Sequence, residues 1–248
     1  MITYGGVIMR IQKGYFIRKI VKNRIIILNL SLIILIFCAV FARLNDETHL
    51  ETQVFYPLKN VETSESVYSM TLNLNGKENK KDVRLLSQIL NGMNVKGTFF
   101  VSVEWINDNE DLMKQIKNDG HYFGMIIDYH ESFSTRNKVI YYLASQNDEY
   151  YSKTGEYPEY IRIISDKSGK IPELISAFGQ KHISSSFNFS TSENAVSEGD
   201  IVLVEKISSE TPYSIASFIS KCSAKGFKSI SLDLLLSIED KKETENSK

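Results

Sequence analysis

Three residues that could bind a metal or transfer a proton stand together directly after an apolar run. The run is 121–127, and Asp128, Tyr129 and His130 follow it. Carboxylate and imidazole groups ligate divalent cations and act as general acids and bases. At the carboxyl end of a strand they would lie where parallel α/β sheets hold their functional sites. The alternative is that His130 is a solvated or hydrogen-bonded residue with no role in chemistry.

Two strands and a helix must position these residues. Residues 97–103 are rich in Thr, Phe and Val, which favours a strand, and the run at 121–127 is the second strand. Between them we expect a helix from about Asn107, capped by Asp108 and ended by Gly120. A strand, helix and strand with short links form a βαβ unit, which belongs in a parallel sheet.

The same alternation continues along the chain from residue 66. Further strands are predicted at 68–74, 160–164, 182–189, 201–204 and 227–232. Further helices are predicted at 82–90, 137–152, 171–178, 211–226 and 234–238. About seven strands alternating with helices indicate an α/β sheet or barrel.

The amino-terminal part has the pattern of a membrane anchor. Residues 1–42 contain six Lys or Arg and no Asp or Glu, and 25–42 is a run of 18 uncharged residues. Such a run just spans a bilayer core, and the basic residues before it place the N-terminus in the cytoplasm. The alternative is a cleaved signal peptide with Val40 and Ala42 at its cleavage site. The start is either Met1 or Met9.

These patterns divide the chain into five segments. We expect a basic cytoplasmic segment at 1–24, a transmembrane helix at 25–42, a stalk at 43–65, a folded domain at 66–239 and a charged tail at 240–248. The protein would then be a single-pass protein of the cell membrane whose carboxyl-terminal domain is extracytoplasmic.

The charge balance argues against a nucleic-acid partner, and the cysteine content argues against a disulfide or a Cys-rich metal site. Beyond residue 42 the chain has 23 Lys or Arg against 30 Asp or Glu, an acidic balance that argues against a nucleic-acid partner. The only cysteines are Cys38, inside the apolar run, and Cys222. No disulfide within the folded domain and no Cys-rich metal site is therefore expected.

Several motifs, in this order, resemble the polysaccharide deacetylase family, carbohydrate esterase family four. They are MTLNLNG at 70–76, VKGTFF at 95–100, NDGHYFG at 118–124, GDIVLVE at 199–205 and KGFKSISL at 225–232. The resemblance covers roughly residues 67–238. It implies a distorted, incomplete (β/α) barrel of about seven strands, here preceded by the transmembrane helix.

The resemblance also implies a chemistry whose residues are mostly replaced. The family holds a divalent metal with one Asp and two His, and uses a second Asp as general base and a late His as general acid. By motif, the base position is Asn73, and the metal-binding Asp position is Leu74, or Asn75 after a slip of one residue. The two His positions are Ile126 and His130, so only the second is retained.

The two remaining motifs are altered as well. Arg162 keeps the Arg of an Arg-Pro-Pro-Tyr-Gly motif whose prolines are gone, and Glu205 stands where the late His belongs. We expect Arg162 and Glu205 to form a salt bridge in the old cleft. Because catalytic zinc sites use three protein ligands, we expect no metal cofactor and no family reaction.

Some of these residues could instead bind a sugar. Trp105 comes just after the strand predicted at 97–103. It could stack on a sugar ring, or it could be a packed residue at a helix start. Asn73 and Asn75 lie two apart on a strand and face the same side, where they could bind a sugar or satisfy loop backbone.

The sequence therefore predicts a membrane-anchored, extracytoplasmic, deacetylase-like protein that is catalytically inactive and binds envelope glycan or an envelope protein. One alternative is an active metal-dependent N-deacetylase with a remodelled site built from Asp128, His130 and Glu205. The other is an envelope scaffold that does not touch glycan.

Overall fold

A parallel sheet forms the centre of the molecule in the computed structural model, which describes residues 57–128, 135–164, 171–189 and 195–238. The strands are β1 (Val67–Leu74), β2 (Gly97–Val101), β3 (Tyr122–Asp128), β4 (Tyr160–Ile164), β5 (Lys181–His182), β6 (Phe187–Asn188), β7 (Asp200–Val204) and β8 (Lys228–Ile230). Their order is β5-β4-β3-β2-β1-β7-β6, with β8 paired to β1, and every pairing is parallel.

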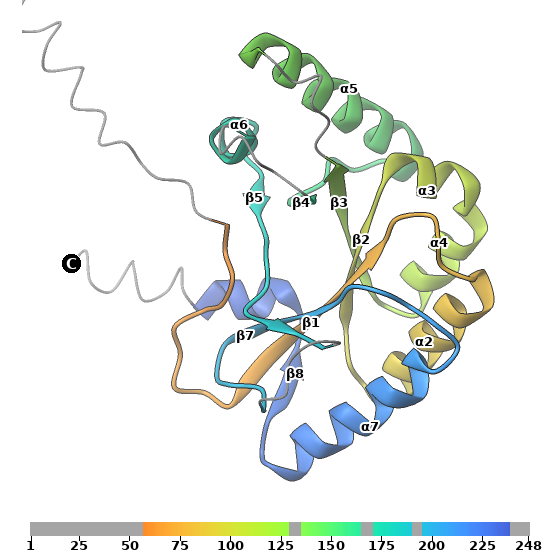
Figure 1. The fold of residues 1–248 in the computed structure, drawn as a ribbon, viewed down its shortest axis with the longest axis vertical. Coiled ribbons are helices and arrows are strands. Elements are labelled where there is room, and N and C mark those ends of the chain that lie inside the picture. Colours follow the sequence, from red (N-terminus) through yellow and green to blue (C-terminus); the bar gives the residue numbers. More distant parts are fainter. Residues whose placement is uncertain (1–56, 129–134, 165–170, 190–194, 239–248) are drawn as a thin grey trace, which may run out of the picture. The chain divides into compact units, whose positions relative to one another are not determined.

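Helices connect the strands and cover the outer face of the sheet (Figure 1). They are α2 (Lys80–Gly92), α3 (Val103–Asp108), α4 (Glu110–Asn118), α5 (Arg136–Thr154), α6 (Ile171–Ala177) and α7 (Thr211–Ala224), and residues 232–238 form a further helical segment. Among the described residues, no helix is long and apolar enough to cross a membrane. The segment predicted to do so, 25–42, lies outside the described residues.

Strand β1 separates two cores because its side chains alternate between the faces of the sheet. Tyr68, Met70, Leu72 and Leu74 belong to the main core, which lies between the sheet and the helices. A smaller inner core on the other face includes Phe100, Ile126, Ile201 and Leu232. All eight residues of β1 are buried, as expected of a strand with neighbours on both sides and layers on both faces.

The sheet curves into a barrel that the strands do not close. Within the described residues β5 and β6 end the strand order and do not pair with each other. The chain before β1 lies between β5 and β7 instead: Leu58 forms a parallel bridge with Ile183, and Asn60 an antiparallel bridge with Asp200. The incomplete (β/α) barrel predicted from the resemblance is confirmed.

Two element predictions were wrong in detail. The helix expected from Asn107 is two helices, and the first begins at Val103 because Ser102, not Asp108, caps it by accepting a hydrogen bond from the Trp105 N–H at 3.1 Å. Asn109 separates them, with its side-chain amide donating to the Trp105 carbonyl at 2.8 Å. The strand expected at 182–189 is two short strands, β5 and β6.

Candidate functional site

The carboxyl ends of the parallel strands meet at one edge of the sheet, which we call the carboxyl edge. Asn73 is next to last in β1, Asp128 ends β3 and Ile164 ends β4. Strand register pairs Asn73 with Phe100, and Ile126 with Arg162. The fold therefore gathers most of the predicted site residues in one region, as the motif alignment required.

Arg162 occupies the centre of this region and is 4% exposed. Its Nη1 donates to Asn73 Oδ1 at 2.9 Å, and its Nη2 donates to Thr71 Oγ1 at 2.9 Å. Its Nε and Nη2 also donate to the carbonyls of Ile183 and Ser184, at 3.3 and 3.1 Å. Four hydrogen bonds to described residues thus hold the guanidinium, and each of these acceptors is an amide, hydroxyl or carbonyl oxygen.

The Arg162 guanidinium also lies over an aromatic ring, with its central carbon 4.1 Å from the Phe100 centroid. Burial lowers the pKa of Arg162 to about 9, which still leaves the group cationic at pH 7. In the part of the chain that the structure describes, no carboxylate is paired with it. Among the described residues, this positive charge is therefore compensated by dipoles and a ring.

Glu205 does not supply the missing negative charge, so the predicted salt bridge with Arg162 was wrong. Glu205 is exposed just after β7, and its Oε2 accepts a hydrogen bond from Asn188 Nδ2 at 3.3 Å. Thr71 and Asn73, on the inward face of β1, are the groups that contact Arg162 instead.

The residues at the family's metal positions do not fit a metal. Leu74 is fully buried in the main core, and Ile126 is 3% exposed in the inner core; hydrocarbon side chains cannot ligate a cation. Asn75 is exposed, and its backbone N–H donates to Glu78 Oε1 at 3.2 Å. His130 lies outside the described residues. Among the described residues, no three His, Cys, Asp or Glu are grouped to hold a metal ion.

Asn73 cannot replace the family's general base. Its side-chain oxygen accepts the Arg162 hydrogen bond, and an amide takes up no proton near neutral pH. The described residues of the old centre therefore include neither a base at the base position nor a ligand at Leu74 or Ile126.

A polar cavity of about 470 Å³ nevertheless remains at the carboxyl edge. Its lining includes Asn75, Ser102, Glu104, Asp128, Tyr142 and Gln146. Burial, and then the charges of Glu104 and Asp128, raise the pKa of Tyr142 to about 12, so its phenol is protonated at neutral pH. Carboxylates, amides and a phenol in one cavity can bind a ligand rich in hydroxyl groups.

Four of these six cavity residues were missed by the sequence analysis: Ser102, Glu104, Tyr142 and Gln146. Glu104 lies in the first turn of α3, three residues beyond the end of β2, and Tyr142 lies on α5. The rule that function sits beyond strand ends would have found Glu104, because it follows β2 so closely. Nothing in the local pattern distinguishes Tyr142 from the other tyrosines of its helix.

Trp105 is not part of the cavity. Trp105 is 3% exposed and packs in the main core. The second interpretation, a packed residue at a helix start, is therefore the one that agrees with the structure. The ring faces of Trp105 are not available to a sugar.

Known proteins were compared with this chain by sequence and by fold. The model of the polysaccharide deacetylase family, described as "Polysaccharide deacetylase", matches residues 61–167. No curated protein matches the sequence.

Solved structures of the same fold include enzymes and non-enzymes. A family 4 carbohydrate esterase from Bacillus anthracis is 24% identical, with 72% of this chain and 86% of that chain covered and a TM-score of 0.63. The wild-type family 4 pseudoenzyme BA3943, also from Bacillus anthracis, is 19% identical, with 76% and 71% covered and a TM-score of 0.64. A mutant of BA3943 with restored enzymatic activity is 19% identical, with 76% and 74% covered and a TM-score of 0.65. At these identities the likeness shows the fold.

Proposed function

Since this chain belongs to the polysaccharide deacetylase family, we propose that it binds envelope glycan without hydrolysing it. The observation that carries the proposal is the chemistry at the family's reactive positions. Asn73 stands at the base position with its oxygen bound by Arg162, and Leu74 and Ile126 are packed into two separate cores.

Hydrolysis of an acetamide needs an activated water and a group that takes its proton. At the family positions the described cleft has neither a group that activates water nor a group that takes its proton. An amide and two hydrocarbon side chains cannot ligate a metal or accept a proton near neutral pH. That some members of this fold are pseudoenzymes is consistent with such a loss.

The cavity at the carboxyl edge supports binding. Glu104 and Asp128 can accept hydrogen bonds from sugar hydroxyls, Asn75 and Gln146 can both donate and accept them, and the Tyr142 ring adds an apolar surface. Polar groups converging on a cavity of this kind are the usual composition of a small-molecule site.

We place the folded domain outside the membrane. The support is the 18-residue uncharged run at 25–42 with all six basic residues of the first 42 before it. The membrane would then be one partner through this anchor, and cell-wall glycan of the peptidoglycan type the other.

The test uses the full chain purified in detergent. After loading with zinc and dialysis, we expect no retained metal and no acetate release from acetylated chito-oligosaccharides or peptidoglycan. We expect retention on insoluble peptidoglycan or chitin, weakened in Asp128→Asn and Glu104→Gln and unchanged in the control Glu198→Gln, an exposed carboxylate outside the cavity.

Two results would contradict the proposal. Stoichiometric zinc with acetate release that His130→Ala abolishes would show the active N-deacetylase with a remodelled site. Absence of retention on either glycan would favour the non-glycan envelope scaffold.

A further inference from the structure

Exposed aromatic side chains gather at the edge of the sheet opposite the cleft, which we call the amino edge. Tyr122 begins β3 and is 41% exposed, and Tyr157, just before β4, is 61% exposed. The Tyr157 ring stacks on Tyr151, with centroids 4.7 Å apart and planes 23° from parallel. Phe178, after α6, is 40% exposed. Clustered exposed rings mark binding surfaces more often than single ones do.

Two cavities open on this edge and share a wall. The first has a volume of about 190 Å³ and includes Tyr122 and Asp233 in its lining. The second has a volume of about 470 Å³ and includes Asp148 and Phe178. Tyr157 and Glu159 line both, so the cavities are adjacent.

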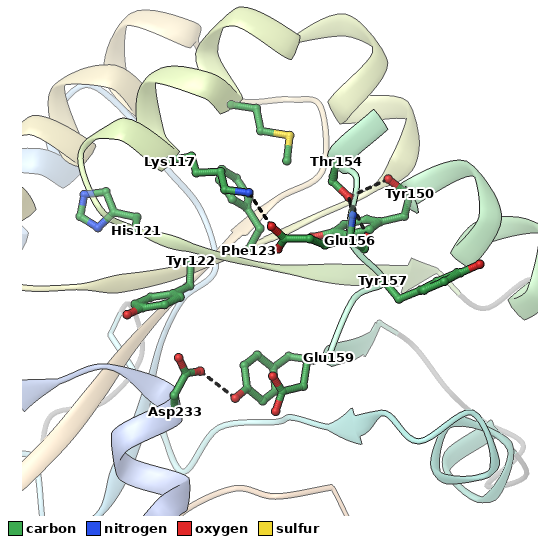
Figure 2. Close-up of a pocket in the computed structure, with 12 residues that line it drawn as sticks. Lys117, His121, Tyr122, Phe123, Tyr150, Thr154, Glu156, Tyr157, Glu159 and Asp233 are labelled. Atoms are coloured by element: carbon green, nitrogen blue, oxygen red, sulfur yellow. Dashed lines mark hydrogen bonds and ion pairs between the residues drawn. The ribbon is translucent and has the colours of Figure 1, made fainter. Parts of the chain in front are cut away.

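The charges of the two cavities are unbalanced. Their linings contain the carboxylates of Asp148, Glu156, Glu159 and Asp233 but only one ammonium, that of Lys117. Lys117 is already paired with Glu156 at 3.1 Å. Figure 2 shows this pair on one side of β3, with Tyr122, Glu159 and Asp233 on the other.

Glu159 and Asp233 lack a cationic partner in the described part of the chain. Asp233 Oδ1 accepts a hydrogen bond from the Tyr160 hydroxyl at 2.7 Å, and no described ion pair involves either carboxylate. His121, in the wall of the first cavity, adds no positive charge at neutral pH, because burial lowers its pKa.

We propose that the amino edge, formed by Tyr122, Asp148, Tyr157, Glu159, Phe178 and Asp233, binds an oligosaccharide that carries free amino groups. An exposed tyrosine ring packs against the apolar face of a sugar ring, and a carboxylate pairs with its ammonium group. The shared wall of Tyr157 and Glu159 allows neighbouring sugars to occupy the two cavities. No residue of the carboxyl-edge cavity takes part, so this site is additional to the proposed function.

Both the charge and the strand positions favour this ligand. An acetylated sugar is neutral and leaves Glu159 and Asp233 without a counter-ion, so it should bind more weakly. A basic peptide finds no free strand to extend at Tyr122 or Tyr160, because β3 and β4 are interior strands with neighbours on both sides.

The test is calorimetric titration of the full chain with a glucosamine hexamer and with its fully N-acetylated counterpart. We expect saturable binding of the hexamer that weakens as salt is raised, and weaker binding of the acetylated form at this edge. Glu159→Gln combined with Asp233→Asn should weaken hexamer binding by about tenfold or more, because charge-assisted contacts are lost. Tyr157→Ala should weaken it as well.

Controls separate this site from surface charge elsewhere and from misfolding. Glu198→Gln removes an exposed carboxylate that lines neither the amino-edge cavities nor the carboxyl-edge cavity, and it should leave hexamer binding unchanged. Asp233→Asn keeps an acceptor for the Tyr160 hydroxyl, and thermal unfolding of each variant verifies its fold.

The proposal is overturned if the double variant binds the hexamer as tightly as the unchanged chain. It is equally overturned if the acetylated oligomer or an oligolysine peptide binds this edge more tightly than the hexamer. If Glu104→Gln weakens retention of acetylated glycan while the double variant leaves hexamer binding unchanged, the proposed function stands and this inference falls.

Discussion

At the scale of single residues, two of the positions that the family resemblance assigns to the reactive centre, Asn73 and Arg162, contact each other. Arg162 is buried, cationic and bound by neutral oxygens, with Asn73 in place of a carboxylate. A buried charge without a counter-ion is costly unless hydrogen bonds and dipoles compensate it. Phe100 and the carbonyls of Ile183 and Ser184 contribute that compensation here.

Asn73→Asp should therefore stabilise the fold. The new carboxylate would lie at the 2.9 Å contact with Arg162 Nη1, and we expect a gain of about 1 to 2 kcal/mol in the free energy of unfolding at pH 7. Arg162 would hold the pKa of the new carboxyl below its unfolded value, so the gain is present above about pH 4 and is lost as pH falls through the lower folded pKa. Urea unfolding at pH 7 and pH 3 measures this. The exposed Asn75→Asp serves as control, and a loss of stability at pH 7 would contradict the argument.

His121 should make the fold sensitive to mild acid. Its Nδ1 accepts from the Gly97 N–H at 3.2 Å, and its Nε2 contacts the Ser87 carbonyl at 3.0 Å, so the ring is buried in its neutral form. Burial lowers its pKa below the usual value near 6.5. As pH falls, the unfolded chain therefore takes up the proton before the folded chain does. The contribution of His121 to the free energy of unfolding is fully present above about pH 6.5 and declines as pH falls below that value. Unfolding midpoints between pH 7.5 and 5 should fall less steeply in His121→Asn, and equal slopes would refute this role.

At the scale of elements, the segment before β1 completes the barrel. Leu58 N–H donates to the His182 carbonyl at 2.8 Å, and Ser184 N–H donates to the Leu58 carbonyl at 2.8 Å. Val61 N–H donates to the Gly199 carbonyl at 2.9 Å, which fixes the segment beside the start of β7. These contacts satisfy backbone groups at the open side of the barrel that strands alone leave unpaired.

Gly199→Ala should disrupt this docking. Gly199 has φ +74°, and an added Cβ would overlap the Val61 carbonyl oxygen, so the segment must move. Gly155 is a matched control with φ +76° and no atom within 4 Å of an added Cβ. We expect Gly155→Ala to cost about 1 kcal/mol for its backbone conformation and Gly199→Ala to cost at least about 2 kcal/mol more. Similar losses in thermal unfolding of the two variants would show that the segment is not held at Val61.

At the scale of the whole molecule, each core includes a residue at a position that the family resemblance assigns to a metal ligand. Leu74 fills the main core, and Ile126 fills the inner core. These two positions are thus tied to packing on both faces of the sheet, and placing metal ligands at them requires polar groups in each core.

The triple variant Asn73→Asp, Leu74→Asp, Ile126→His should therefore fold poorly. Each core substitution removes packed apolar atoms and buries a polar group, at a cost of roughly 3 kcal/mol or more per site. Circular dichroism and urea unfolding should show a large loss of stability relative to Asn73→Asp alone. A folded triple variant that retains zinc and releases acetate would show instead that the cores tolerate the old centre.

Local signals in the sequence were enough for the order of elements and the parallel sheet, and the family resemblance predicted the incomplete barrel. The positions of Asn73, Leu74, Ile126 and Arg162 followed from motif spacing, because short motifs on strands fix which residues reach the carboxyl edge. The boundaries of α3 and of the strands at 181–188 were not predictable, because they depend on Ser102 and Asn109 side-chain contacts and on pairing across the sheet.

The sequence by itself determined which residue types stand at the positions that the resemblance assigns to the metal and the base, and residue type decides whether a side chain can ligate or accept a proton. Only the tertiary structure decided what surrounds them: Arg162 contacts Thr71 and Asn73 across 91 and 89 residues of sequence, while Glu205 is exposed. The tyrosines and carboxylates of the amino edge likewise come together from β3, α5, the residues before β4 and the residues after β8. Such contacts join distant segments, and it is the curvature and register of the sheet that bring those segments together.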